Sequence, residues 1–587
     1  MSTDRPGATE YSPSDIRADE PTVARVVGLV GLGATTLGVA AVLAKAVLGS
    51  DRWISSSMGY LFAVVGIACL LYHAIRDADI EIRRVYGGLA ALLLVGAVVV
   101  SFVPGTGSDA ILSAYGYYFL PWGAVCALLG LLFGVAFSRN ETDDRYRRVG
   151  EAALLGVGVG LLSLTAILGL GGTVAPVGPV AVLGLLGLLF LSGFLAQTDT
   201  ADGLGYWVAV GLGVLGAGLV LAALGRVIFP TVLFDGPKAL RRLDQTLDYW
   251  AMGARAVLVL LCVGGGWWAI RAKGLPVWLR GLLALTAVGF AAVFVVGSFT
   301  NPLTVEPKGY LVPSGLLLMG LGVLFLGVSV GVCSEHPLVV LTRRELGAYF
   351  CSPVAYLVLF GTTVMAALGY SQLVSMLTDP RSVSDILEPI LSQYWAFDIV
   401  GAITTAFVVP VLTMRTFSEE KRTGTFEMLL TAPVSEATVV LSKFVASLLF
   451  YLATWIPAGL FLVGLWVAGG QPFQYKPALG FFLAVTACGC GFIGLGVFFS
   501  SLTRNQIVAA VLTFAAMMFM LLTVVRPVFA SAFSPEFLNV LKWVDYLGLW
   551  RQALNGQLPV PELVAQVSFG VFWLLLTIKV LEARKWN

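Results

Sequence analysis

Side chains that could take part in chemistry are concentrated in one stretch of this sequence. Residues 414–444 read MRTFSEEKRTGTFEMLLTAPVSEATVVLSKF, and eight of these 31 residues are charged, about twice the share found in the whole chain, which is 12% charged. The eight are Arg415, Glu419, Glu420, Lys421, Arg422, Glu427, Glu436 and Lys443. The stretch lies between two long apolar runs. So many charged residues are unusual at such a place and indicate a specific role.

The remaining sequence offers no pattern typical of an enzyme. It contains no G-x-x-x-x-G-K-[ST] loop to cradle ATP phosphates, and no Ser/His pair or paired carboxylates within its apolar runs. A membrane-embedded enzyme would need such groups. Ionisable side chains are energetically costly within a membrane, so those found there usually have a function. Two histidines and seven dispersed cysteines do not predict a metal or haem site. We therefore predict a chain without catalytic residues, metal or cofactor of its own.

Composition indicates an all-α polytopic integral membrane protein. The mean hydropathy is +0.89, and apolar runs of about 20 residues, each long enough to cross a bilayer as a helix, recur along the chain. A membrane β-barrel would instead alternate apolar and polar residues in short segments. The net charge of +2 comes from basic residues in short loops, which does not predict nucleic-acid binding.

The apolar runs predict about 16 transmembrane helices, ten before residue 335 and six after it. The first ten lie near 23–48, 57–75, 86–104, 115–138, 150–170, 176–196, 204–223, 253–271, 280–299 and 312–332, and the other six near 353–373, 396–413, 438–466, 477–500, 506–525 and 566–580. Basic loops place the N- and C-termini in the cytosol. The basic loop 224–252 falls on the opposite side and makes the span count least secure there.

Two glycine patterns lie inside predicted spans. Gly211, Gly213 and Gly216 match G-x-G-x-x-G, and so do Gly489, Gly491 and Gly494. A dinucleotide-binding fingerprint would require a preceding strand and a βαβ unit. Small residues within apolar spans let helices approach closely, so we interpret both patterns as helix packing.

Residues 414–437, which we term the charged segment, predict a structured surface. Gly424 permits a sharp turn, and Thr425 can cap a short helix that begins at Phe426 and ends at Pro433. Ser435 then caps the next span. An ordinary solvated connector could be shorter and would not need apolar side chains beside the membrane, whereas a surface that fits a partner explains both features.

The charged segment resembles the cytosolic coupling region of type-2 ABC exporter permeases, in the branch of the gliding-motility and nitrous-oxide-reductase accessory permeases. That pattern is approximately E-x-x-x-G-T, then E-x-L-L-x-x-P-[VI]-S, then G/S-K. It is matched here by Glu420, Gly424, Thr425, Glu427, Leu429, Leu430, Pro433, Val434, Ser435 and Lys443. Ser442 stands where glycine is more usual.

The resemblance implies a six-span permease domain over residues 337–587. It places an amphipathic elbow helix at 341–351, the coupling loop at 414–437 and outer helices at 526–565. Ahead of this domain, residues 1–22 read as a disordered cytosolic tail and residues 23–335 as a multi-span domain of unknown role.

The same resemblance implies partners. A separate cytosolic P-loop ABC ATPase, which holds ATP and magnesium, would dock on the charged segment, and two permeases would form a homodimer or a heterodimer in the lipid bilayer of the bacterial inner membrane. The docking residues would be Glu419, Glu420, Lys421, Arg422, Gly424, Thr425, Phe426, Glu427, Leu429, Leu430 and Pro433. The charged ones would make polar contacts, while Phe426, Leu429 and Leu430 would fill a groove of the ATPase. The transported substrate is not readable.

Two alternatives remain open at this point. An ion-gradient-driven transporter or channel would need carboxylates or broken helices at the membrane midplane, and the spans are poor in both. A membrane scaffold that recruits a cytosolic partner through the same segment would lack only a substrate pathway.

Overall fold

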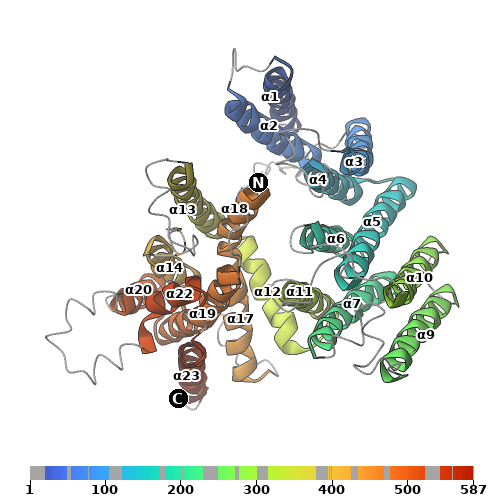
Figure 1. Cartoon of the computed structure of the whole chain (residues 1–587). Helices are drawn as coiled ribbons and strands as arrows, with labels where there is room; N and C mark the ends of the chain where they lie inside the picture. Colours follow the sequence, from blue (N-terminus) through green and yellow to red (C-terminus); the bar gives the residue numbers. More distant parts are fainter. Residues whose placement is uncertain are drawn as a thin grey trace, which may run out of the picture. The chain divides into compact units, whose positions relative to one another are not determined.

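The computed structural model is built from helices (Figure 1). It describes residues 20–48, 55–76, 79–104, 122–171, 179–200, 203–228, 249–271, 277–299, 315–378, 394, 397, 399–424, 434–467, 476–521, 543–557 and 559–585. Contacts divide the chain into two compact units, Met1–Leu326 and Gly327–Asn587, which we term the N-terminal and C-terminal units.

The division between the units falls inside one helix, α11 (Leu316–Cys333). The predicted domain bounds at residues 335 and 337 stay predictions. The first part of α11 packs within the N-terminal unit. A Cβ atom at Gly322 would lie 2.7 Å from the carbonyl oxygen of Gly216, and a Cβ at Gly216 would lie 2.5 Å from that of Gly322. These two glycines therefore set the close approach of α11 to α7 (Gly203–Ile228).

In the N-terminal unit, consecutive helices pair as antiparallel hairpins, with α1 against α2, α3 against α4, α5 against α6 and α9 against α10. Their bounds are α1 Glu20–Leu48, α2 Ser56–Arg76, α3 Ile80–Ser101, α4 Ala124–Asn140, α5 Asp144–Gly171, α6 Pro179–Leu195, α7 Gly203–Ile228, α9 Tyr249–Arg271 and α10 Val277–Phe299.

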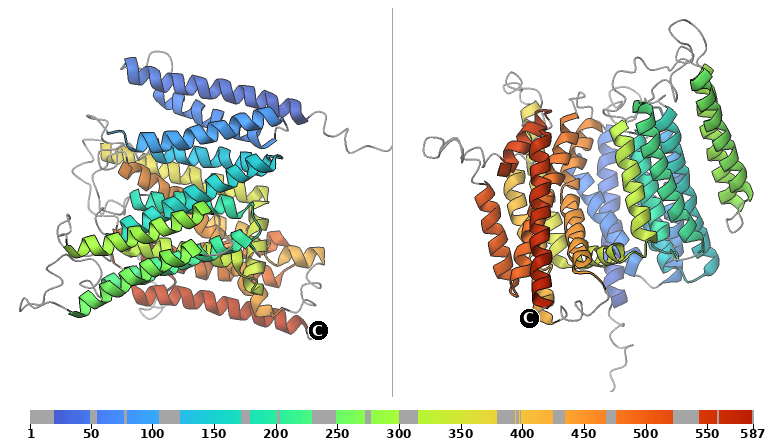
Figure 2. Two further views of the ribbon diagram at one scale, coloured as in Figure 1. Left: turned by 90° about the vertical axis from the view of Figure 1, so that its right-hand side faces the viewer. Right: turned by 90° about the horizontal axis from the view of Figure 1, so that it is seen from below.

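The C-terminal unit is arranged around one helix, α19. This helix packs against α14, α17, α20, α22 and α23 (Figures 1 and 2). The bounds are α12 Pro337–Phe350, α13 Pro353–Thr378, α14 Ile399–Thr413, α15 Ser418–Thr423, α17 Glu436–Thr454, α18 Ile456–Val467, α19 Lys476–Leu502, α20 Gln506–Leu521, α22 Tyr546–Leu554 and α23 Val560–Lys585. Its aromatic core is centred on Trp550, whose ring centroid lies 5.4 Å from those of Trp455 and Tyr546 and 5.6 Å from that of Phe481.

Each predicted span coincides with a helix or a pair of helices. Among the residues that the structure describes, ten helices are long and apolar enough to cross a membrane and five shorter ones are apolar, so the structure supports a multi-pass membrane protein. The number of 16 spans and the cytosolic termini stay predictions. The predicted span 438–466 corresponds to α17 and α18, which are separated only at Trp455 and together form one candidate span, Glu436–Leu462; Pro457 just after Trp455 cannot donate a helical hydrogen bond.

Helix α12 covers the segment predicted as an elbow. It turns by 98° from the end of α11. Pro337 occupies its first turn, where no donor is needed, and His336 Nδ1 accepts a hydrogen bond from the amide of Leu338 at 3.3 Å. Of the predicted outer helices, α22 and the first residues of α23 are described, and residues 526–542 lie outside the described part.

Glycines set the seam between α19 and α23. A Cβ atom at Gly494 would lie 2.9 Å from the carbonyl oxygen of Gly570, and one at Gly570 would lie 2.6 Å from that of Cys490. The packing interpretation is thus confirmed for Gly494 and Gly216, while a Cβ at Gly211 would meet nothing within 4 Å.

The close contact between α19 and α23 predicts that one added methyl group will destabilise the protein. Gly570→Ala should lower the free energy of unfolding by about 1–3 kcal/mol, because backbone on the facing helix cannot move aside easily. The matched control is Gly361→Ala on α13, where a Cβ meets nothing within 4 Å. Thermal unfolding in detergent measures both, and equal midpoints for the two variants would contradict the close seam.

Candidate functional site

The charged segment contains a helix at a place where the sequence predicted a turn. Helix α15 spans Ser418–Thr423, and Gly424 ends it with a φ of +76°, the left-handed conformation that glycine adopts without strain. As predicted, Ser435 caps the next helix, its hydroxyl accepting from the amide of Thr438 at 3.2 Å. The predicted helix after Gly424 lies outside the described residues, and so do Thr425, Phe426, Glu427, Leu429, Leu430 and Pro433.

The start of α15 is capped by a residue from a distant helix. Phe417 stands at the N-cap and offers no side-chain acceptor. Instead, the Ser500 hydroxyl on α19 accepts from the amides of Phe417 and Ser418 at 3.1 and 3.2 Å, and lies 3.2 Å from the carbonyl oxygen of Met414, to which it can donate. Sequence analysis missed Ser500, since nothing local marks a contact across more than 80 residues.

Lys421 ties the same short helix to the end of α19. It is buried, and its ammonium donates to the carbonyl oxygen of Ser501, one residue before α19 ends. The last carbonyl groups of a helix lack partners within it and carry partial negative charge, which suits a cation. Phe417 beside it is fully buried, so α15 is fixed on α19 at both polar and apolar contacts.

A buried ammonium joins α15 to two more helices. Lys443, on α17, has a side chain that is 3% exposed, and its Nζ lies 2.7 Å from Glu420 Oε1 on α15 and 3.0 Å from Glu345 Oε1 on α12. It also lies 5.5 Å from the centre of the Phe417 ring. We term Lys443, Glu345 and Glu420 the lysine triad. Its net charge is −1, and Glu420 Oε2 is buried without a protein partner.

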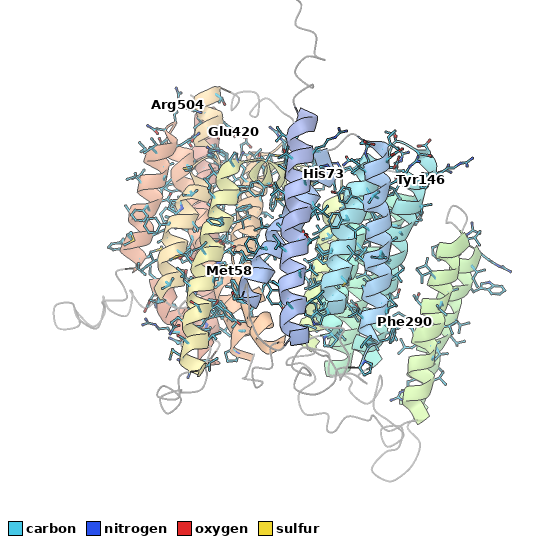
Figure 3. All side chains as sticks on the ribbon, turned by 90° about the horizontal axis from the view of Figure 1, so that it is seen from above. Met58, His73, Tyr146, Phe290, Glu420 and Arg504 are labelled. Atoms are coloured by element: carbon cyan, nitrogen blue, oxygen red, sulfur yellow. The ribbon has the colours of Figure 1, made fainter. Side chains whose placement is uncertain are left out.

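The four charged residues predicted on α15 therefore divide into two faces. Glu420 and Lys421 point inward to the partners just described. Glu419 and Arg422 have side chains 41% and 64% exposed, and their mutual contact of 4.0 Å is a weak surface pair. Figure 3 shows Glu420 at the same end of the C-terminal unit as Arg504.

Tyr349 fastens α12 to the helices around it. Its hydroxyl donates to the carbonyl oxygen of Leu412 on α14 at 2.9 Å and lies 2.8 Å from Ser447 Oγ on α17. Its ring stacks on Phe450 at 5.1 Å. Burial raises the pKa of the Tyr349 phenol, which therefore stays neutral and keeps its donor.

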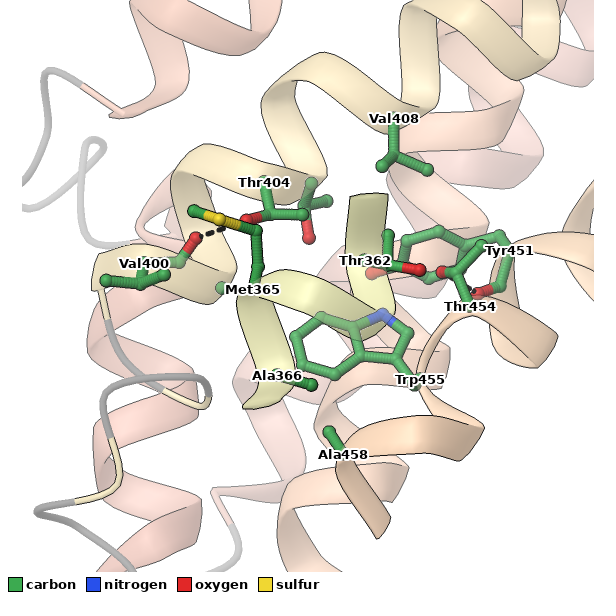
Figure 4. Close-up of a pocket in the computed structure, with 12 residues that line it drawn as sticks. Thr362, Met365, Ala366, Val400, Thr404, Val408, Tyr451, Thr454, Trp455 and Ala458 are labelled. Carbon is green, nitrogen blue, oxygen red and sulfur yellow. Dashed lines mark hydrogen bonds between the residues drawn. The ribbon is translucent and has the colours of Figure 1, made fainter. Parts of the chain in front are cut away.

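A small cavity lies deeper in the bundle, among α13, α14 and α17 (Figure 4). Its volume is about 30 Å³, room for about one or two water molecules. Its polar lining comes from Thr362, Thr404, Thr405, Thr454 and Tyr451, and the buried Tyr451 hydroxyl has no protein partner. In this conformation the cavity can hold water and nothing larger.

Comparison with known families now bears on the site. Residues 354–579, which run from α13 into α23, match the sequence model of the family described as ABC-2 family transporter protein. The match supports an ABC-2 type permease. Such a permease is a membrane component of an ABC transporter, and it works in general with a partner ATP-binding subunit. No protein with a curated description matched the chain.

The lysine triad predicts a large effect of neutralising its centre. Lys443→Met should lower the free energy of unfolding by about 3–5 kcal/mol, because it leaves two half-buried carboxylates facing each other. Lys579→Met is the matched control, since that lysine is 72% exposed beside Glu582, and it should cost under about 1 kcal/mol. Denaturant titration measures both, and a Lys443→Met variant as stable as its control would contradict the triad.

The cap from α19 predicts a difference between two adjacent serines. Ser500→Ala removes the acceptor of two α15 amides and should destabilise α15 by about 0.5–2 kcal/mol. Ser501→Ala should leave α15 intact, because only the backbone carbonyl of Ser501 holds Lys421. Amide hydrogen exchange over residues 417–423 measures the effect, and equal exchange in both variants would argue against the cap.

Proposed function

We propose that this chain is the permease subunit of an ATP-driven exporter, of the branch that the charged segment resembles. A separate cytosolic P-loop ATPase would dock on the exposed face of α15 and on residues 425–433. The observation that carries the proposal is the mounting of α15: a six-residue helix held by polar contacts to α12, α17 and α19 while Glu419 and Arg422 face outward.

These contacts would let α15 pass a movement of the bound ATPase on to the neighbouring helices. A helix of six residues has too few internal hydrogen bonds to stay folded alone, so its position is set by its neighbours. A push on Glu419 or Arg422 would reach α19 through Ser500 and Lys421, and would reach α17 and α12 through Lys443. From α19 it would pass to α22 and α23, which pack along it.

The chemistry of the cycle would belong to the partner. ATP and magnesium would be held by the ATPase, and this chain would contribute coupling residues and no catalytic group. Two permease domains, from two copies or from a related permease, would form the pathway across a bacterial inner membrane, with 16 spans per chain and both termini in the cytosol. Docking is proposed for the residues of the charged segment as predicted, with the polar contacts assigned to Glu419 and Arg422.

The docking surface is tested by charge reversal on the exposed face of α15. The Glu419→Lys, Arg422→Glu double variant should recover at least about tenfold less P-loop ATPase than wild type when the solubilised protein is pulled down from native membranes, since two polar contacts become repulsive. Arg504→Glu, a reversal at the same end of the unit but outside the charged segment, should recover wild-type amounts (Figure 3).

Two outcomes would contradict this assignment. Loss of the ATPase in the Arg504→Glu variant as well would show a general charge effect. Failure of wild type to recover any P-loop ATPase, under conditions that keep transporter complexes intact, would favour a membrane scaffold over a transporter subunit.

A further inference from the structure

A cavity of about 280 Å³ lies beside the lysine triad, bounded by α12, α13, α14, α15 and α17. Its lining is charged at one end and apolar at the other. Its charged lining residues are Arg344, Arg415, Glu419 and the lysine triad, and its apolar wall includes Val354, Val358 and Val411. All of these residues belong to the C-terminal unit.

The cavity lies where apolar spans meet charged residues. Its apolar wall consists of residues from the first turns of α13 and the last turns of α14, and both helices belong to candidate membrane spans. On the other side lies α12, which turns by 98° from the end of α11 and so runs across the direction of a span. That combination places the cavity at the depth of lipid headgroups.

Side chains of both signs line this cavity. Lys443 is already committed to two carboxylates, which leaves the lysine triad with a net charge of −1 and leaves Glu420 Oε2 as a buried acceptor without a donor. Arg344 forms no ion pair with any described residue. Arg415 donates to Ser352 Oγ at 3.3 Å and lies 3.9 Å from Glu419. The cavity thus offers an anionic acceptor and cationic donors on the same wall.

We propose that this cavity binds the headgroup of a phosphatidylethanolamine lipid. The phosphate would be held by the guanidinium groups of Arg344 and Arg415, which suit phosphate oxygens. The ammonium would donate to Glu420 Oε2, and an acyl chain would lie along Val354 and Val358. Phosphatidylglycerol has no ammonium for that acceptor, and the trimethylammonium of phosphatidylcholine has no N–H to donate.

Such a lipid would contact α12, α13, α14 and α15 together. It would complete the polar partners of Glu420, a residue on which the position of α15 depends. The lipid would therefore act as one more support of the charged segment.

The test is lipid retention measured by native mass spectrometry. Delipidated full-length protein in detergent is mixed with equimolar phosphatidylethanolamine, phosphatidylglycerol and phosphatidylcholine of identical acyl chains. Wild type should retain the ethanolamine lipid in preference to the other two. Arg344→Gln should lower that retention about tenfold, as expected for the loss of a hydrogen bond between charged groups.

A neighbouring arginine provides the matched control. Arg343→Gln removes the same charge from the same helix, but Arg343 does not line the cavity and donates instead to the carbonyl oxygen of Val332. It should retain lipid as wild type does. Glu420→Gln should abolish the preference for the ethanolamine lipid over phosphatidylglycerol, since the ammonium loses its carboxylate.

Three outcomes would overturn the proposal. They are equal retention of all three lipids by wild type, equal loss in the two arginine variants, and an unchanged preference in Glu420→Gln. If Glu420→Gln does not fold, Val358→Phe replaces it, because that change fills the apolar end without touching a charge. Wild-type retention by Val358→Phe would then count against the site.

Discussion

One buried ammonium, that of Lys443, fixes the relative position of three helices in the C-terminal unit. A cation removed from water needs anionic partners. Lys443 lies on α17, and its partners are Glu345 on α12 and Glu420 on α15. Buried ion pairs contribute little net stability compared with apolar packing, but they tolerate few alternative geometries. The charge therefore serves mainly to hold α15 in one place.

The rest of the charged segment follows from that constraint. Because α15 is short, it depends on contacts from outside, and α19 supplies two of them: the Ser500 hydroxyl accepts from the first amides of α15, and the carbonyl of Ser501 accepts from the Lys421 ammonium. With Glu420 and Lys421 turned inward, the helical geometry leaves Glu419 and Arg422 outside. Two pairs of charges of the same signs thus face opposite ways, one inward and one outward.

The sequence predicted the long helices well and the charged segment in part. Spans are readable because a run of about 20 apolar residues has few other folded solutions in a membrane. Ser435 and Gly424 were also predictable, since capping and turning depend on local residue types. Helix α15 was not, because SEEKRT shows no apolar periodicity and its supports come from Lys443 and Ser500 far along the chain. The inward turn of Glu420 is likewise a tertiary effect that no local pattern reveals.

The positions of two prolines suggest where movement of this rigid end can be absorbed. Pro410 lies inside α14, between the threonine-lined cavity and the charged segment, and its missing amide leaves one helical hydrogen bond unmade. Pro457 follows the break between α17 and α18 at Trp455, which also lines that cavity. Both prolines lie near the small threonine-lined cavity. Prolines inside or beside helices are where helices bend most readily, so α14 and the α17–α18 pair are expected to be less stiff at these positions than α15, which is held by polar contacts to α17 and α19.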